Sequence, residues 1–200
     1  GYTLESKFTI IEGKEKKETV VYKVAGIHGR NLAIATSDSP GSRMVILSAK
    51  GGMWMQKENM RKPLRISPAQ RLLGQASNAD VVGVQLGDDY TPHSFSKGVL
   101  TVVPKSDAIN GSYAKIELKV SNRGSELIEK GVFYGSTGRA IKNVDYIYSD
   151  GRIKGMLISG ADFSEQQTSV EFSQAKEEEW NEALFNSENI LELTRRVLRK

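Results

Sequence analysis

The feature that most constrains the fold is an alternation of apolar and polar residues with a period of two. In YAKIELKV, residues 113–120, the apolar side chains of Ala114, Ile116, Leu118 and Val120 fall on one face and charged side chains on the other. This is the pattern of a β-strand with one solvated side. Glycine-containing turns separate similar runs at short intervals, which predicts antiparallel neighbours. The other predicted strands are 4–11, 19–25, 31–36, 43–47, 53–57, 99–103, 126–134, 139–148, 152–159 and 168–172.

About ten strands in one open sheet do not stay flat, because the twist between neighbouring strands accumulates. The sequence therefore predicts a mainly β fold of the α+β type, with a single curved antiparallel sheet. The chain has 200 residues, and we expect residues 1–200 to form a single domain.

Three short regions carry helix signals. The stretch SPAQ, residues 67–70, combines an N-cap serine with a proline at the first helical position, which predicts a helix ending at Gly74. A second helix is predicted from Asn78 to Gly87, although Gly83 is unfavourable inside it. A C-terminal helix is predicted from Ser187 and should pack on the sheet. Its apolar stripe consists of Ile190, Leu191, Leu193, Val197 and Leu198.

Composition excludes several classes of function. The chain has no cysteine, so disulfides, thiolate catalysis and cysteine-ligated zinc are excluded. The net charge is +4, but Lys14, Lys16 and Lys17 are interleaved with glutamates, so we expect no nucleic-acid partner. No run approaches the ~18 apolar residues of a membrane span, and we expect a protein that does not span a membrane.

The search for reaction chemistry is negative. His28 and His93 are the only histidines. A zinc site completed by Asp88 or Asp89 is conceivable, but the spacing matches no zinc motif and favours two loop histidines. The sequence also lacks a nucleophile elbow, a Walker A loop and a dinucleotide-binding glycine motif. We therefore predict no catalytic residue, no metal and no cofactor.

The stretch MWM, residues 53–55, places three large apolar side chains in a row. A period of two puts Met53 and Met55 on one face of a strand and Trp54 on the other. These side chains form either ordinary core or the wall of a ligand site, since the flexible thioether of methionine suits both. The pattern by itself leaves both interpretations open.

The longer stretch MWMQKENMRKPLRISPAQRLLGQASNADVVGVQLGDDYTP resembles a segment of the bacterial outer-membrane lipoprotein-sorting protein family, the relatives of the periplasmic carrier LolA. The residues that fall in register with the family pattern are Trp54, Met55, Arg61, Lys62, Arg65, Ile66 and Ser67. The run YAKIELKVSNRGSELIEKGVFYGSTGRAIKNVDYIYSDGRIKGMLI and the closing FNSENIL are also similar to that family. The resemblance spans nearly the whole chain.

This resemblance implies an open half-barrel of LolA type, formed by one strongly curved antiparallel sheet with an apolar concave face covered by short helices. It also implies a periplasmic carrier that shelters the acyl chains of a lipoprotein or another lipid, with an inner-membrane transporter as a partner. Two alternatives remain open: an envelope sensor domain of the same fold, and an enzyme that uses the same cavity on a small molecule.

On this reading, Arg61 and Arg65 form the polar rim or lid of the lipid site. The predicted apolar lining of the cavity and its lid is Met53, Trp54, Met55, Ile66, Leu72, Leu73, Val81, Val82, Leu118, Phe133 and Met156.

Overall fold

The structure is a computed structural model that describes residues 1–38, 43–108, 111–121, 127–161 and 165–199. Its strands are β1 (Tyr2–Glu12), β2 (Glu15–Ile27), β3 (Arg30–Ala35), β4 (Met44–Ala49), β5 (Gly52–Lys57), β6 (Leu64–Ile66), β7 (Arg71–Leu73), β8 (Ala76–Ser77), β9 (Tyr90–Ser96), β10 (Val99–Pro104), β11 (Lys115–Val120), β12 (Ile128–Tyr134), β13 (Ala140–Ser149), β14 (Arg152–Gly160), β15 (Gln166–Phe172) and β16 (Lys176–Glu177). The helices are α1 (Asn78–Val82), α2 (Leu86–Asp89), the 3-10 turn η1 (Glu182–Leu184) and α3 (Ile190–Arg199).

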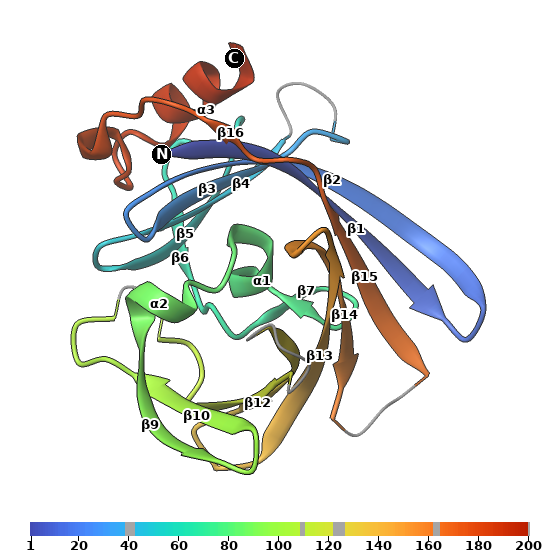
Figure 1. The fold of residues 1–200 in the computed structure, drawn as a ribbon. Helices are drawn as coiled ribbons and strands as arrows, with labels where there is room; N and C mark the ends of the chain where they lie inside the picture. The colour runs from blue at the N-terminus through green and yellow to red at the C-terminus, as the bar shows by residue number, and fades with distance from the viewer. Residues whose placement is uncertain (39–42, 109–110, 122–126, 162–164, 200) are drawn as a thin grey trace.

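Fourteen of these strands form one antiparallel sheet, in the order β6-β5-β4-β3-β2-β1-β15-β14-β13-β12-β11-β10-β9, with β16 beside β1. The sheet curls strongly but does not close, since β6 and β9 lie at its opposite ends (Figure 1). The predicted fold class, an open half-barrel with a few short helices, is confirmed. Strands β1 and β15, from the two ends of the chain, pair at the centre of the sheet.

The predicted strands are present, and five further strands, β6, β7, β8, β9 and β16, were not predicted. Glu126, the first residue of one predicted strand, lies outside the described residues. Strand β9 was not among the period-two runs because six of its seven residues are exposed, so its two faces do not differ in polarity.

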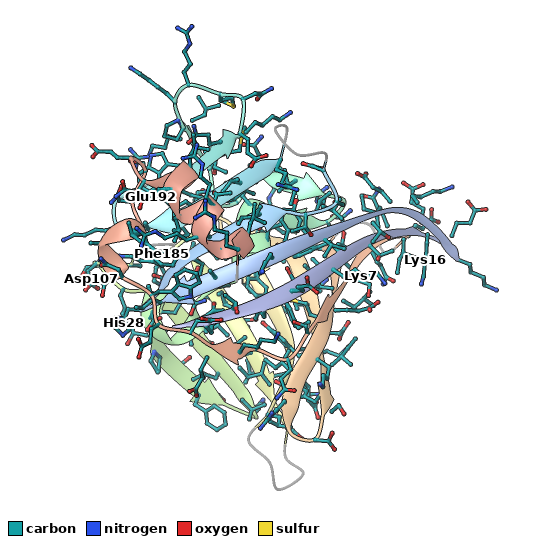
Figure 2. All side chains as sticks on the ribbon, turned by 90° about the horizontal axis from the view of Figure 1, so that it is seen from above. Lys7, Lys16, His28, Asp107, Phe185 and Glu192 are labelled. Atoms are coloured by element: carbon teal, nitrogen blue, oxygen red, sulfur yellow. The ribbon has the colours of Figure 1, made fainter. Side chains whose placement is uncertain are left out.

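The two faces of the sheet are covered by different parts of the chain. Helix α1 and the β7–β8 hairpin lie inside the curve of the sheet, and α3 lies on the outside (Figures 1 and 2). An inner cluster of buried apolar residues joins α1 to both halves of the sheet, and an outer cluster joins α3 to β2, β3 and β4. Strands β3 and β4 are therefore buried on both faces, which explains their unbroken apolar runs.

The prediction of a helix over residues 67–74 is wrong. Ser67 to Gln70 form a turn, in which the Gln70 N–H donates to the Ser67 carbonyl at 3.3 Å. Serine at the first position and proline at the second favour a turn as well as a helix start. Gly74 then adopts a φ of +56° in the short connection between β7 and β8, a conformation that glycine tolerates.

The second predicted helix is two shorter ones. Helix α1 ends before Gly83, whose φ of +88° is incompatible with a continued helix, and α2 follows as a separate helix. The N-cap of α1 is Ser77 rather than Asn78. The Asp80 carboxylate accepts the Ser77 backbone N–H at 2.7 Å, which is half of a capping box.

The C-terminal helix is confirmed but begins at Ile190 rather than Ser187. Its buried face consists of Ile190, Leu193, Thr194 and Val197, and the other two leucines of the predicted stripe are only partly buried. Within the described residues, the structure contains no helix long and apolar enough to cross a membrane.

Candidate functional site

The candidate site is the concave face of the half-barrel, where strands from both ends of the chain contribute alternate side chains. Most of the residues predicted to line a lipid site meet here, within or against the inner cluster. They are Met53, Ile66, Leu72, Leu73, Val81, Val82, Leu118, Phe133 and Met156. Aromatic rings extend this face, because Tyr113 and Phe133 pack edge to face with their centroids 4.9 Å apart. The concave face is thus a continuous apolar surface in the interior.

Trp54 does not share this surface. It lies opposite Arg65 in the β5–β6 pair and packs with the outer cluster, on the face that carries α3. The Arg65 guanidinium donates to the Gly51 carbonyl at 2.9 Å and, with Arg61, borders a cavity beside Trp54. Met55 is partly buried and belongs to neither cluster. Met53 and Trp54 pack on opposite faces of the sheet, as the alternation predicted, but the structure places Trp54, Arg61 and Arg65 away from the concave face.

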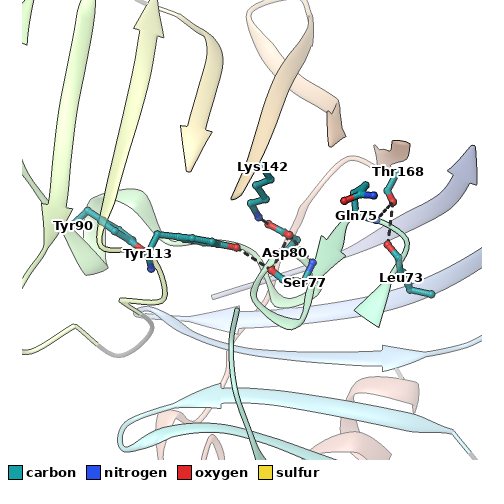
Figure 3. Close-up of polar contacts among 8 residues, drawn as sticks. All are labelled: Leu73, Gln75, Ser77, Asp80, Tyr90, Tyr113, Lys142 and Thr168. Carbon is teal, nitrogen blue, oxygen red and sulfur yellow. Dashed lines mark hydrogen bonds and ion pairs between the residues drawn. The ribbon is translucent and has the colours of Figure 1, made fainter. Parts of the chain in front are cut away.

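The concave face is occupied by residues 71–82, which we call the inner segment: the β7–β8 hairpin followed by α1. Its hairpin is held to β15 by the buried hydroxyl of Thr168. This hydroxyl accepts the Gln75 N–H at 2.9 Å and donates to the Leu73 carbonyl at 3.0 Å (Figure 3). The backbone approaches so closely that a Cβ on Gly74 would lie 2.7 Å from the Thr168 oxygen.

The second attachment of the inner segment is a buried ion pair. The Lys142 ammonium of β13 contacts the Asp80 carboxylate of α1, and both side chains are at most 5% exposed (Figure 3). The same carboxylate accepts the Ser77 hydroxyl at 2.8 Å, and that hydroxyl lies 3.0 Å from the Tyr113 hydroxyl. The ammonium also lies over the rings of Tyr113 and Phe133, each at 4.6 Å from the ring centroid, where cation–π attraction supports its charge.

Burial controls the ionisation of this group of residues. Desolvation lowers the pKa of Lys142, and the nearby Asp80 carboxylate partly opposes that effect. Desolvation, with the negative charge of Asp80, raises the pKa of Tyr113 well above its ordinary value. Burial raises the pKa of Tyr90 to about 12, although its hydroxyl also accepts the Tyr113 N–H. The two phenols are therefore neutral at pH 7, and the only charges in this polar group are those of the ion pair.

A cavity of about 700 Å³ lies at one rim of the half-barrel, next to the end of α1. Its apolar walls include Leu4 of β1, Ile153 of β14 and Phe172 of β15, and Gly83 borders it. None of the side chains predicted to line a lipid site is among its walls. Leu4 and Phe172 were inside predicted strands, but their sequence positions are far apart, and only the pairing of β1 with β15 brings them together.

The histidines are not brought together. The His28 Nδ1 lies 3.0 Å from the Glu182 carboxylate, which also contacts Arg30, and His93 lies on exposed strand β9. In the described part of the chain, no three His, Cys, Asp or Glu side chains are grouped in a way that could hold a metal ion.

Comparison with known proteins was informative only at the level of structure. No family model matches the sequence, and no curated protein matches it. Among solved structures, a LolA superfamily protein from Nitrosomonas europaea superposes with a TM-score of 0.75 at 20% identity, over 94% of this chain and 90% of that one.

Two further structures have the same architecture. A putative outer membrane lipoprotein-sorting protein domain from Vibrio parahaemolyticus superposes with a TM-score of 0.65 at 16% identity, over 95% of this chain and 91% of that one. A DUF1329 family protein from Desulfovibrio piger superposes with a TM-score of 0.64 at 18% identity, over 94% of this chain and 90% of that one. The predicted resemblance is confirmed at the level of the fold, which is LolA-like.

Proposed function

We propose that this protein is a periplasmic carrier without enzymatic activity, which shelters the acyl chains of a lipoprotein or another lipid on the concave face of its half-barrel. The observation that carries the proposal is the continuous apolar inner cluster, which the short inner segment covers. The LolA-like fold supports it, since two of the similar structures are described as LolA superfamily and lipoprotein-sorting proteins. In this proposal residues 1–200 act as one domain, and an inner-membrane transporter delivers the lipid.

In this proposal an acyl chain enters at the rim cavity. A cavity of about 700 Å³ lies within the range of ligand pockets, roughly 300–1,000 Å³. The end of α1 borders it at Gly83, so a chain that enters there meets the inner segment first. Ile153 is 47% exposed at this rim and offers an apolar contact to the incoming chain.

The acyl chain then replaces the inner segment on the concave face. The three most buried large apolar side chains of that segment are Leu73, Val81 and Val82, and uncovering each costs roughly 1.5–3 kcal/mol. Each methylene of an acyl chain gains about 0.8 kcal/mol on burial. Roughly six to eleven methylenes therefore offset the uncovering of these three side chains. Separating Lys142 from Asp80 adds about 3–5 kcal/mol, which about four to six further methylenes offset. The exchange needs no catalytic group.

The proposal is tested by titration with a fluorescent fatty-acid probe. Met156 of β14 is partly buried and packs against the inner cluster, so Met156→Asp puts a charge on the sheet wall where the acyl chain should lie. We expect affinity to fall at least about tenfold, which is ~1.4 kcal/mol. The control is Leu64→Asp, on a leucine that is 55% exposed, and we expect it to bind normally. A folded Met156→Asp protein that binds the probe as well as the control would contradict the proposal.

A further inference from the structure

Three basic residues of the MWMQKENMRKPLR stretch gather on the outer face, where the proposed carrier function does not use them. Arg61, Lys62 and Arg65 border a groove of about 520 Å³, which we call the outer groove. Its other walls are Trp54, Gln56 and Pro63 from the same stretch, and Ser187, Glu188 and Leu191 from the start of the C-terminal helical region. Segments more than 120 positions apart in the sequence thus form one concave surface.

The charged residues of the outer groove are mostly basic. Within the described ranges none of its three cations forms an ion pair, and Glu188 is the only acidic residue of the lining. Elsewhere on the surface, exposed lysines such as Lys7 and Lys130 face carboxylates. Uncompensated positive charge that converges on a concavity attracts an anionic partner.

The groove is also preformed. The buried side chain of Gln56 donates to the Met60 carbonyl at 3.0 Å, and the Met60 N–H donates to the Lys57 carbonyl at 2.9 Å. These bonds fix the loop that carries Arg61 and Lys62. Trp54, which is partly buried, supplies an amphipathic indole of the kind enriched at binding interfaces. The backbone of the loop therefore loses little conformational entropy when a ligand binds.

We propose that the outer groove is a docking site for an acidic segment of a partner protein, one that carries both carboxylates and an apolar side chain. The cations receive the carboxylates, and the surface of Trp54, Pro63 and Leu191 receives the apolar group. A concave site between a loop and a helix accommodates a peptide chain, whereas a bilayer surface contacts protruding residues. This docking site lies on the opposite face from the inner cluster, so it does not depend on the proposed lipid site.

The test is titration with a fluorescein-labelled peptide of alternating glutamate and leucine, with emission of the protein's tryptophans as a second readout. The variant is Arg61→Glu with Lys62→Glu, since neither side chain has a hydrogen bond or ion pair in the described structure. The matched control is Lys14→Glu with Lys16→Glu, which makes the same change of charge at the far end of the β1–β2 hairpin (Figure 2).

We expect saturable binding to the unaltered protein with a dissociation constant below about 100 μM, weakened by salt. The groove variant should lose at least about tenfold in affinity, and the hairpin control should lose less than about twofold. Equal losses in the two variants, or no saturable binding to the unaltered protein, would overturn the proposal. Binding to phosphatidylglycerol vesicles but not to the peptide would also overturn it, in favour of a membrane surface.

Discussion

Removal of either partner of the buried Asp80–Lys142 pair is expected to destabilise the protein strongly, and removal of Asp80 should make stability rise with pH. Both side chains are nearly inaccessible to solvent, so the group that remains is buried without its partner. Loss of one member of a buried pair costs about 3–5 kcal/mol. For Lys142, whose pKa is lowered by burial, the cost of neutralisation gives a similar magnitude.

In Asp80→Asn, Lys142 becomes neutral in the folded state. Its pKa is already lowered by burial, and a free lysine has a pKa of about 10.4, so giving up the proton at pH 7 costs up to about 4.5 kcal/mol. The unfolded chain then binds more protons than the folded one. The stability of this variant therefore rises with pH up to about pH 10, by at most about 1.4 kcal/mol per unit.

In Lys142→Met, the Asp80 carboxylate loses its cation but keeps the Ser77 N–H and hydroxyl as hydrogen-bond donors. These donors offset part of the cost of a buried charge without its partner, so we expect a loss toward the lower end of about 3–5 kcal/mol.

The assay is urea unfolding at pH 5, 7 and 9. The double variant Asp80→Asn with Lys142→Met carries neither charge, and we expect it to lose less stability than either single variant. The control is Lys130→Met, which breaks the exposed pair with Asp145 and should have no measurable effect. Single variants that behave like this control at all three pH values would refute the reasoning.

Two further predictions concern the inner segment and the rim cavity. Gly74→Ala should destabilise the protein by about 1–3 kcal/mol, because the new Cβ would meet the Thr168 hydroxyl. The control is Gly13→Ala, which is also at positive φ but has nothing within 4 Å of the new Cβ. Thermal unfolding should show a smaller loss of stability for this control. Ile153→Asp at the cavity should weaken fatty-acid probe binding at least about threefold, whereas Ile147→Asp, equally exposed but outside the cavity lining, should not. Equal effects within either pair would contradict the corresponding structural assignment.

The sheet could be predicted from sequence because its signal is local. Strand β11 alternates between buried and more accessible residues, as Ile116 and Leu118 of the predicted run indicated, but Ala114 precedes the strand and is exposed. Strand β9 could not be found in this way, since both of its faces are mostly exposed. The helix prediction at Ser67 failed for another reason, because its serine and proline suit both a turn and a helix start. The turn is held by α1, whose Asn78 and Ala79 N–H groups donate to the Gln70 and Pro68 carbonyls.

The candidate site was less predictable than the fold. Asp80 and Lys142 are 62 positions apart, and their spacing carries no signal that they pair. The serine and aspartate of SNAD, residues 77–80, did carry the spacing of a capping box, a signal that could have located the helix start. The sequence also could not show on which face of the sheet Trp54 lies. A period of two puts Trp54 and Met53 on opposite faces but does not indicate which face is concave.

The most direct test of the carrier proposal is photo-crosslinking with a fatty acid that bears a diazirine near the end of its chain, followed by peptide mass spectrometry. The proposal predicts labels on the concave face, at Leu118, Phe133 or Met156 and on residues 71–82, which an excess of unlabelled fatty acid abolishes. Labels confined to the outer cluster around Trp54, or labelling that unlabelled fatty acid does not reduce, would contradict it.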